Sequence, residues 1–420
     1  MMTKNNIPAG YKDSAVGVIP QEWEVKRLVD LCHNTGDYGI NAPAIPYQED
    51  LPTYLRITDI DGWGKFIKTD KVSVNNPNSS QYILREGDIV FARTGATVGK
   101  TYLYAPKDGQ LIFAGFLIRF TPNPNKIIPY YIKVYTETTT YWNWVRVISQ
   151  RSGQPGINSV EYGTMKLAVP PMEEQRKIAE ILGMWDEAID KQSRLIEKLE
   201  LRKRGLMQRL LIGRTRLPGF TTPWQKVKLG EICKRVTRRN EENNQNVITI
   251  SAQKGFVSQT DFFNKSVASS TLDNYYLVLK DEFCYNKSYS NGYPMGAIKR
   301  LKEADKAVVT TLYICFSIAD NKRLDINFFE QFCENGGFNQ GLMKVANEGG
   351  RAHGLLNVTP TDFFSLEMLL PTFPEQKAIA EVLTTADDEI ATQRKRLDAL
   401  RLQKRGLMQQ LLTGKIRVKI

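Results

Sequence analysis

Histidine, paired cysteine and long apolar runs are scarce in this chain of 420 residues, and each scarcity excludes a class of function. Only His33 and His353 are present, so histidine-based metal sites and Ser-His-Asp triads are nearly excluded. The five cysteines are odd in number and form no Cys-x-x-Cys pair, which indicates neither a disulfide framework nor a zinc site. The longest apolar run, around Leu111 to Ile118, is too short to span a membrane, and the segment before Pro20 is polar. We therefore expect a cytoplasmic protein that has no membrane contact.

Sequence motifs for catalytic cofactors are missing as well. The segment from Gly95 to Thr101 looks like a phosphate-binding loop, but three residues rather than four separate its glycines, and a β-like run follows it. Glu24-Val25-Lys26 has the spacing of metal-dependent nucleases, whereas its later copy, Gln225-Lys226-Val227, does not. Neither an Asn-Pro-Pro-Tyr type tetrapeptide nor a GxGxxG after a strand indicates an S-adenosylmethionine pocket. The sequence therefore predicts a non-enzymatic chain that binds no metal and no cofactor of its own.

The composition is that of a folded, basic protein. Hydrophobic residues make up 42% of the chain, and its length suggests two or three domains with real cores. Lysine and arginine outnumber aspartate and glutamate by 57 to 45, which gives a net charge of +12. A polyanionic partner such as double-stranded DNA is therefore favoured.

Two nearly identical stretches, Glu174 to Gly213 and Glu375 to Gly414, organise the chain 201 positions apart without an insertion. About half of their paired positions are identical. Each predicts one helix, roughly 55–60 Å long at 1.5 Å per residue, with an apolar seam at alternating steps of four and three. The seam residues, which we predict to serve helix pairing, are Ile178, Leu182, Trp185, Ile189, Gln192, Ile196, Leu199, Ile379, Leu383, Ile390, Gln393, Leu397 and Leu400, and Ala386 stands at the step that matches Trp185.

The duplication of the seam favours pairing of the two helices. One apolar stripe alone is typical of a surface helix that faces its own core. Here, however, Gln192 and Gln393 occupy the same polar step of both seams, and a polar core residue often fixes the register of a coiled coil. An antiparallel coiled coil centred on these glutamines would place Trp185 against Leu400, and Ala386 against Leu199.

The repeat extends to the start of each half. Trp23, in Ile19-Pro20-Gln21-Glu22-Trp23, is echoed 201 positions later by Trp224. We therefore predict an α+β protein with an internal pseudo-two-fold repeat, in which two α/β domains are separated by two long helices that form an antiparallel coiled coil. The predicted boundaries are 1–172 and 215–373 for the domains, and 173–214 and 374–415 for the helices.

The regions between opening motif and long helix are diverged and predict short strands and helices. One helix is expected over Pro129 to Val147, whose aromatic residues are more typical of a core than of a base-stacking surface. The predicted strands are Tyr54 to Thr58, Asp88 to Arg93, Leu111 to Phe120, Val247 to Ile250 and Val308 to Ser317.

Glycine-rich loops with basic and amide side chains are the candidate DNA contacts, because they combine hydrogen-bond donors with close backbone approach. They lie at comparable places in the two halves, although each alone is an ordinary solvated loop. The candidate DNA-binding residues are Arg93, Thr94, Lys100, Arg151, Gln154 and Asn158 in the first half, and Lys287, Tyr289, Asn291, Arg351 and His353 in the second.

Four motifs give the chain a family resemblance. They are Ile19-Pro20-x-x-Trp23, the run Gly87 to Gly95, Pro170-Pro171-x-x-Glu174-Gln175-x-x-Ile178 and the Lys-Arg-Gly-Leu-Met-Gln helix ends. In this order, and over essentially the whole chain, the sequence resembles the specificity subunit of type I restriction-modification systems. The second half departs from the pattern at Tyr285-Asn286-Lys287 and at Thr372-Phe373-Pro374.

The resemblance implies a function. It implies two target-recognition domains held apart by antiparallel helices and reading a two-part DNA site. It also implies subunit docking on the helices that carry the seam residues: two modification (methyltransferase) subunits, which bring S-adenosylmethionine, and restriction/translocase subunits, which use ATP and Mg²⁺.

The repeat by itself leads to the same mechanism. A pseudo-dyad presents two heads to a duplex, and rods of roughly 55–60 Å exceed one helical turn of DNA, about 34–36 Å. Two short and different blocks, separated by unread base pairs, are therefore expected. The alternatives are a helical scaffold whose globular heads bind other proteins, and a nuclease or methyltransferase in its own right.

Overall fold

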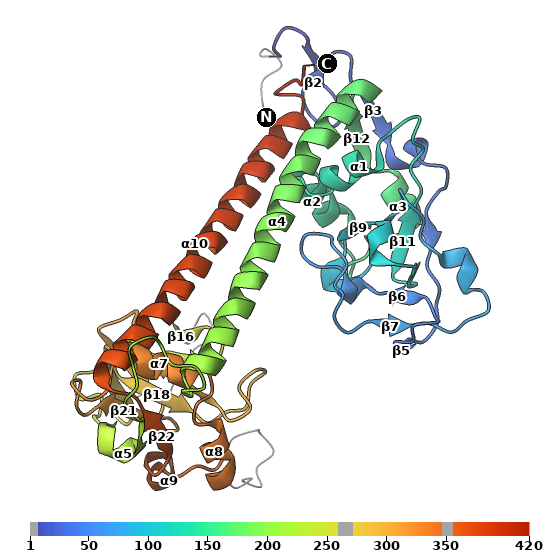
Figure 1. Ribbon diagram of the computed structural model, residues 1–420. Helices are drawn as coiled ribbons and strands as arrows, with labels where there is room; N and C mark the ends of the chain where they lie inside the picture. The colour runs from blue at the N-terminus through green and yellow to red at the C-terminus, as the bar shows by residue number, and fades with distance from the viewer. Residues whose placement is uncertain (1–6, 259–271, 347–355, 420) are drawn as a thin grey trace. The chain divides into compact units, whose positions relative to one another are not determined.

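The computed structural model describes residues 7–258, 272–346 and 356–419. The chain divides into two compact units (Figure 1). Unit 1 comprises Met1–Gln192 together with Arg396–Ile420, and unit 2 comprises Ser193–Lys395. Each unit contains several sheets together with helices, so the predicted α+β class with two sheet-rich domains is confirmed.

Unit 1 is built from short strands and short helices. Its strands are β1 (Tyr11–Lys12), β2 (Ile19–Pro20), β3 (Glu24–Arg27), β4 (Asp37–Tyr38), β5 (Ile45–Pro46), β6 (Thr53–Leu55), β7 (Val72–Ser73), β8 (Ile89–Ala92), β9 (Thr101–Leu103), β10 (Leu111–Phe113), β11 (Leu117–Phe120) and β12 (Lys166–Val169). Its helices, apart from the long ones, are η1 (Leu28–Leu31), η2 (Ile57–Asp59), η3 (Ser79–Tyr82), η4 (Gly95–Thr97), η5 (Pro106–Asp108), α1 (Pro129–Tyr135), α2 (Thr139–Ile148) and α3 (Ser159–Gly163).

Two four-stranded sheets give unit 1 its frame. The antiparallel sheet has the order β4-β11-β8-β9, and the mixed sheet has the order β10-β6-β7-β5. Strand β12 pairs antiparallel with β3 and thereby joins the start of the domain to the segment before the long helix. The predicted strand from Leu111 to Phe120 is divided between the two sheets, because the chain turns at Ala114 to Phe116.

The predicted single helix from Pro129 to Val147 is wrong, because the structure has two helices there, α1 and α2. Threonines interrupt the helical path. The hydroxyl of Thr138 accepts a hydrogen bond from Tyr141 N and caps α2, and the hydroxyl of Thr136 donates to the carbonyl of Lys133. Short hydroxyl side chains compete in this way for the backbone groups of a continuous helix. Of the aromatic residues here, Tyr131, Tyr135 and Tyr141 are buried in the core, Tyr130 and Trp144 pack against it, and Trp142 is exposed.

Unit 2 has an antiparallel sheet with a similar layout, in the order β14-β21-β18-β19. Its strands are β13 (Gln225–Lys228), β14 (Cys233–Val236), β15 (Ile248–Ser251), β16 (Gly255–Ser258), β17 (Tyr276–Leu279), β18 (Phe283–Asn286), β19 (Ala297–Arg300), β20 (Lys306–Val309), β21 (Ile314–Ile318) and β22 (Glu367–Leu370). Its short helices are α5 (Leu229–Ile232), α7 (Ile326–Glu334), α8 (Asn339–Val345) and α9 (Pro360–Phe364).

The two long helices are α4 (Met172–Leu210) and α10 (Phe373–Leu411), and each contributes one part to each unit. Most of the predicted seam residues are buried; Trp185, Gln393 and Leu400 are half-buried. In unit 1, Ile178 and Leu182 of α4 share a core with Met408 and Leu411 of α10. In unit 2, Met207 and Leu210 share a core with Ile379 and Leu383. The long helices are therefore part of each domain's core.

A buried carboxylate fastens the start of α4 in unit 1. Glu174, whose side chain is 1% exposed, accepts a hydrogen bond of 2.9 Å from the indole N–H of Trp23. The guanidinium of Arg417 donates to both of its oxygens, at 2.7 and 3.0 Å. This hydrogen bond is the main reason why the pKa of Arg417 is raised. One carboxylate thus joins the opening motif, the start of α4 and the segment after α10.

Unit 2 contains the same arrangement. Glu375, whose side chain is fully buried, accepts hydrogen bonds from the indole of Trp224 at 3.0 Å and from Arg216 at 2.5 and 2.7 Å. Trp224 and Glu375 lie 201 positions after Trp23 and Glu174, whereas Arg216 lies 201 positions before Arg417. The neighbouring glutamines match too, since the amide groups of Gln175 and Gln376 each bond to one backbone N–H and two backbone carbonyls.

Ion pairs between α4 and α10 occur within each unit. In unit 1 the ammonium of Lys404 lies 2.8 Å from Asp186, and in unit 2 that of Lys203 lies 2.6 Å from Asp387. In unit 2 the ion pairs Glu200–Arg394, Arg202–Glu389 and Lys203–Asp387 rise along α4 as they fall along α10, so these segments are antiparallel. In unit 1, Glu174 binds Arg417 and Asp186 binds Lys404, which gives the same direction. Gln192 belongs to unit 1 and Gln393 to unit 2. Their pairing at the centre of the seam therefore stays a prediction.

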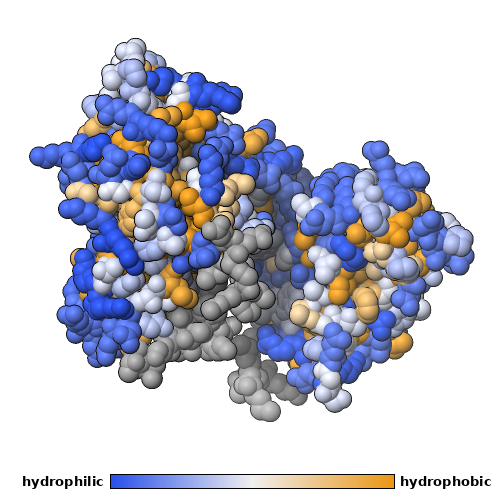
Figure 2. Space-filling model, turned by 90° about the horizontal axis from the view of Figure 1, so that it is seen from below, coloured by the Kyte–Doolittle hydropathy of each residue, from blue (hydrophilic) through white to orange (hydrophobic). Residues whose placement is uncertain are grey.

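The face shown in Figure 2 is predominantly polar, and on it hydrophilic residues surround smaller groups of apolar residues. Among the described residues, no helix has the length and apolarity needed to cross a membrane.

We expect Glu174→Gln to destabilise the protein by about 1–3 kcal/mol, because a buried acceptor for a charged donor is lost. The lower part of this range is expected, since the Arg417 side chain is 36% exposed and water can replace part of the lost interaction. The midpoint of urea denaturation measures the change. The exposed neighbour Glu173 supplies the control, because Glu173→Gln removes the same charge one residue away. Equal midpoints for the two variants would contradict a structural role for the buried pair.

Candidate nucleic-acid interface

Three strand ends meet at one edge of the antiparallel sheet of unit 1. Strand β11 is antiparallel to both β4 and β8, so the start of β11 lies beside the ends of the other two. Tyr38 ends β4, Arg93 follows β8, and Phe116 precedes β11. The edge therefore gathers side chains from three distant parts of the sequence.

Arg93, a predicted DNA contact, is half-buried at this edge. Its guanidinium carbon lies 4.8 Å from the ring centre of Tyr38, and Nη1 donates to the carbonyl of Gly115 at 3.4 Å. The hydroxyl of Tyr38 in turn accepts a hydrogen bond of 3.2 Å from Ser159 N. Burial raises the pKa of Tyr38, but this hydrogen bond and the charge of Arg93 leave it below its ordinary value. The ring holds the guanidinium in place by a cation–π contact.

The two predicted loops of unit 1 form one surface with Arg93. Thr94 pairs with Gly156 as an isolated bridge, and the carbonyl of Arg93 accepts a 2.9 Å hydrogen bond from Ile157 N. Gly95 has a φ of +69°, and a Cβ there would lie 2.8 Å from Nε2 of Gln154. Glycine thus allows the Gln154 amide to lie against the loop backbone. The structure therefore brings together Arg93, Thr94 and Gln154, and their contact with DNA stays a prediction.

The other three predicted residues of unit 1 have local partners. The guanidinium of Arg151 donates to both carboxylate oxygens of Glu161 at 2.6 Å. The side chain of Asn158 accepts a 2.9 Å hydrogen bond from Glu161 N and caps α3. The ammonium of Lys100 donates to the carbonyl of Ile60 at 3.2 Å. These contacts indicate that Arg151 and Asn158 order the loop and α3.

Unit 2 places Lys287 where unit 1 has Arg93. Lys287 follows β18, and its carbonyl accepts a 3.0 Å hydrogen bond from Leu356 N. Burial lowers the pKa of the Lys287 ammonium. Tyr289 is 64% exposed, and Asn291 is exposed in the turn that follows. The remaining two predicted contacts, Arg351 and His353, lie outside the described residues.

Sequence reasoning missed three residues of these edges: Tyr38, Phe116 and Leu312. Phe116 is 57% exposed and Leu312 is 59% exposed. The only signal for Phe116 was the glycine before it, which interrupts the apolar run that begins at Leu111. Tyr38 and Leu312 had no local signal, because their places depend on strand pairing.

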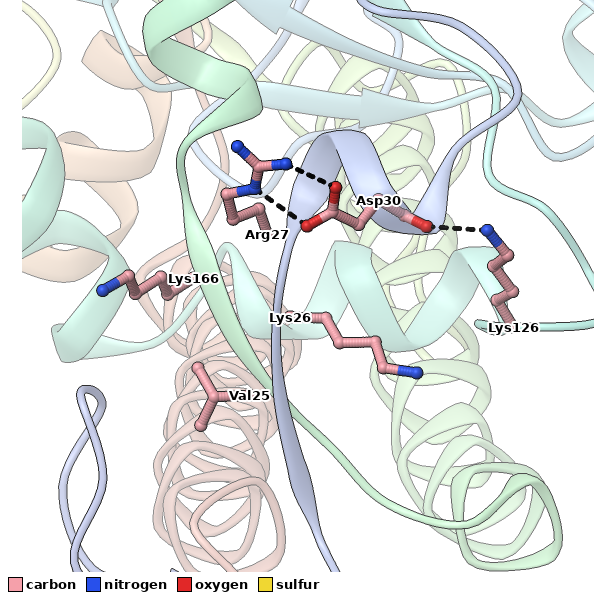
Figure 3. Close-up of a pocket in the computed structure, with 6 residues that line it drawn as sticks. All are labelled: Val25, Lys26, Arg27, Asp30, Lys126 and Lys166. Carbon is pink, nitrogen blue, oxygen red and sulfur yellow. Dashed lines mark hydrogen bonds and ion pairs between the residues drawn. The ribbon is translucent and has the colours of Figure 1, made fainter.

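A cationic pocket of about 390 Å³ lies elsewhere on unit 1 (Figure 3). Arg27 is bound to Asp30 by two hydrogen bonds of 2.8 and 2.7 Å, and Lys126 donates to the Asp30 carbonyl at 3.0 Å. Strand pairing sets Lys166 opposite Arg27, a like-charge pair, whereas unit 2 sets Glu367 opposite Lys228. The pocket is lined by Val25, Lys26, Arg27, Asp30, Lys126 and Lys166.

In the part of the chain that the structure describes, no group of three or more His, Cys, Asp or Glu side chains is arranged to hold a metal ion.

The chain is similar to known proteins along nearly its whole length. Residues 20–201 match the family described as Type I restriction modification DNA specificity domain. A Methanocaldococcus jannaschii protein named as the type I restriction enzyme MjaX specificity subunit is 28% identical over 97% of this chain and 97% of its own. The MjaVIII specificity subunit of the same organism is 24% identical over 96% of this chain and 94% of its own. These relatives are named as specificity subunits, which agrees with the predicted non-enzymatic role.

Two solved structures share the fold. A chain from work on complex assembly and conformational transition of the type I R-M system has a TM-score of 0.53 and 16% identity, over 95% of this chain and 99% of that chain. The S subunit of a type I restriction-modification system from M. genitalium has a TM-score of 0.51 and 14% identity, over 93% of this chain and 96% of that chain.

We expect Asn158→Ala to destabilise unit 1 by about 1 kcal/mol, because α3 loses its N-cap. Asn158→Asp should keep the stability, since aspartate caps a helix equally well, and it should also keep nucleic-acid binding. Urea midpoints and nucleic-acid affinity of the two variants provide the measurement. Loss of sequence-dependent binding by Asn158→Asp at unchanged stability would show instead that the amide itself reads a base.

Proposed function

Because the chain belongs to the family of type I restriction specificity subunits, we propose that it reads a bipartite, asymmetric DNA site, one block with each unit. One observation carries the proposal. In both units a cation directly follows the equivalent strand of the antiparallel sheet, Arg93 after β8 and Lys287 after β18, and its carbonyl accepts a backbone hydrogen bond, from Ile157 N or from Leu356 N.

Chemistry supports base reading at these edges. Arginine, lysine and glutamine side chains donate hydrogen bonds to base edges in the major groove. Arg93 and Gln154 supply such donors in unit 1, and Lys287 supplies one in unit 2. Because the two edges carry different side chains, the two blocks should differ. The net charge of +12 favours the phosphate contacts that supply affinity.

We further propose that α4 and α10 form an antiparallel coiled coil and that the two halves of the chain are related by a pseudo-two-fold axis. The repeated contacts of Trp23 and Trp224 with Glu174 and Glu375 support this proposal. Under it, Trp185 faces Leu400, Gln192 faces Gln393, and the two heads read blocks separated by unread base pairs.

Partner subunits complete the proposed complex. We propose that two methyltransferase subunits and the restriction/translocase subunits dock on this chain in the cytoplasm, along the helices that carry the seam. S-adenosylmethionine, ATP and Mg²⁺ would then be bound by those partners, and this chain would supply sequence recognition alone.

Selection from random duplexes, with the chain alone and with its methyltransferase subunits, is expected to return two short blocks at a fixed spacing. Specific affinity should fall steeply as salt rises, because bound lysine and arginine displace counterions from phosphates. Quantitative binding at 50 and 200 mM salt checks this. Failure to select any sequence, together with a flat salt titration, would favour the helical scaffold whose heads bind proteins.

Arg93→Ala should weaken binding through the first block by about 10- to 100-fold, which is the range for loss of one good base contact. Lys287→Ala should act in the same way on the second block alone. Competition between duplexes with one or the other block scrambled measures each effect. Arg146, an exposed arginine of α2, supplies the matched control, since Arg146→Ala removes a charge without touching the edge. Equal losses at both blocks would contradict independent reading.

A further inference from the structure

Each unit exposes one large apolar side chain at the same point of its sheet edge. In unit 1, Leu117 pairs with Ala92, so Phe116 falls opposite Arg93, whose N–H donates to the Phe116 carbonyl at 3.0 Å. In unit 2, Ile314 pairs with Tyr285, so Leu312, two residues earlier, falls opposite Lys287. The pairing of an exposed apolar residue with the strand-end cation therefore occurs twice.

The turn that presents Phe116 is held firmly by backbone contacts. Leu117 N donates to the Ala114 carbonyl and Gly115 N to the Ile40 carbonyl, both at 2.8 Å. A Cβ on Gly39 would lie 2.2 Å from the Ala114 oxygen, so glycine permits this close approach. Leu312 lies in a comparable turn, where its N–H donates to the hydroxyl of Thr310 at 3.3 Å. An apolar side chain that a bonded turn holds in solvent is a candidate contact rather than a misplaced core residue.

We propose that Phe116 and Leu312 each contact the 5-methyl group of a thymine in the major groove, one in each block of the DNA site. This inference rests on the proposed function. The neighbouring donors, Arg93 and Lys287, suit acceptors of the major groove, where the thymine methyl also lies. Phenylalanine and leucine share an apolar surface but not an aromatic ring. A contact with a methyl group therefore suits both positions, whereas base stacking would suit only Phe116.

Replacement of thymine by deoxyuridine removes this methyl group and nothing else, so it isolates the contact. The probes are duplexes that carry the selected site with one thymine at a time replaced, bound by the chain in complex with its methyltransferase subunits. We expect one replacement in the first block to weaken binding about fourfold, which is the effect of burying one methyl-sized group. Phe116→Ala should weaken binding to the thymine duplex by at least as much and show no further loss on deoxyuridine. Leu312→Ala should give the same coupling in the second block.

Phe116→Leu tests the methyl contact while an apolar side chain remains in the turn. It should keep the discrimination between thymine and deoxyuridine, because leucine occupies the matching place in unit 2. Val147→Ala and Leu369→Ala remove similarly exposed apolar side chains of α2 and β22, and both should leave the binding of every duplex unchanged.

Three results would overturn the inference. The first is a selected block without thymine, or one in which no replacement couples to its variant. The second is an equal effect of Phe116→Ala on both blocks. The third is an equal loss on thymine and deoxyuridine duplexes, with reduced unstacking of a 2-aminopurine probe, which would identify Phe116 as a wedge between base pairs. Absence of any selected sequence for the unaltered protein would instead reject the proposed function.

Discussion

A buried carboxylate that must be paired sets the position of each long helix. Glu174 and Glu375 are almost wholly removed from water, and an unpaired buried charge would be strongly destabilising. In unit 1 the partners of the carboxylate are Trp23 of the opening motif and Arg417 beyond α10. The start of one long helix is therefore bound to the chain that follows the other. This requirement fixes the direction of the paired segments more specifically than apolar burial does, because apolar contact is non-directional.

The sequence was informative wherever a pattern repeats over many residues. The heptad seam predicted long helices close to those observed, and a buried seam residue such as Leu182 follows from its spacing alone. The division of the helix between α1 and α2 was not predictable from apolar spacing, because the hydroxyl of Thr138 decided it. The mixed sheet of unit 1 was also hidden, since its parallel pair joins Thr53–Leu55 to Leu111–Phe113 across a long sequence separation.

The candidate interface was predictable only in part. Arg93 and Gln154 stood out as donors in glycine-rich loops, and the structure brings those loops together. Arg151 and Asn158 looked the same in sequence, but both already have partners in Glu161. Arg151 forms an ion pair with its carboxylate, and Asn158 accepts a hydrogen bond from its backbone N–H as a helix cap. A motif gives the donor type, whereas only the fold shows whether the donor is already used. Tyr38 and Phe116 reach the edge by strand pairing, which no local pattern encodes.

The two units differ in how their residues are distributed along the chain. Unit 2 is one continuous segment, Ser193–Lys395, whereas unit 1 is closed by Arg396–Ile420 after an interruption of the whole of unit 2. On the ribosome, every residue of unit 2 is therefore synthesised before the last strip of unit 1. The core around Trp23 therefore lacks Met408 and Leu411 until unit 2 has been translated. Synthesis thus favours a reversed order of completion, in which the domain that begins the chain is the last to finish folding.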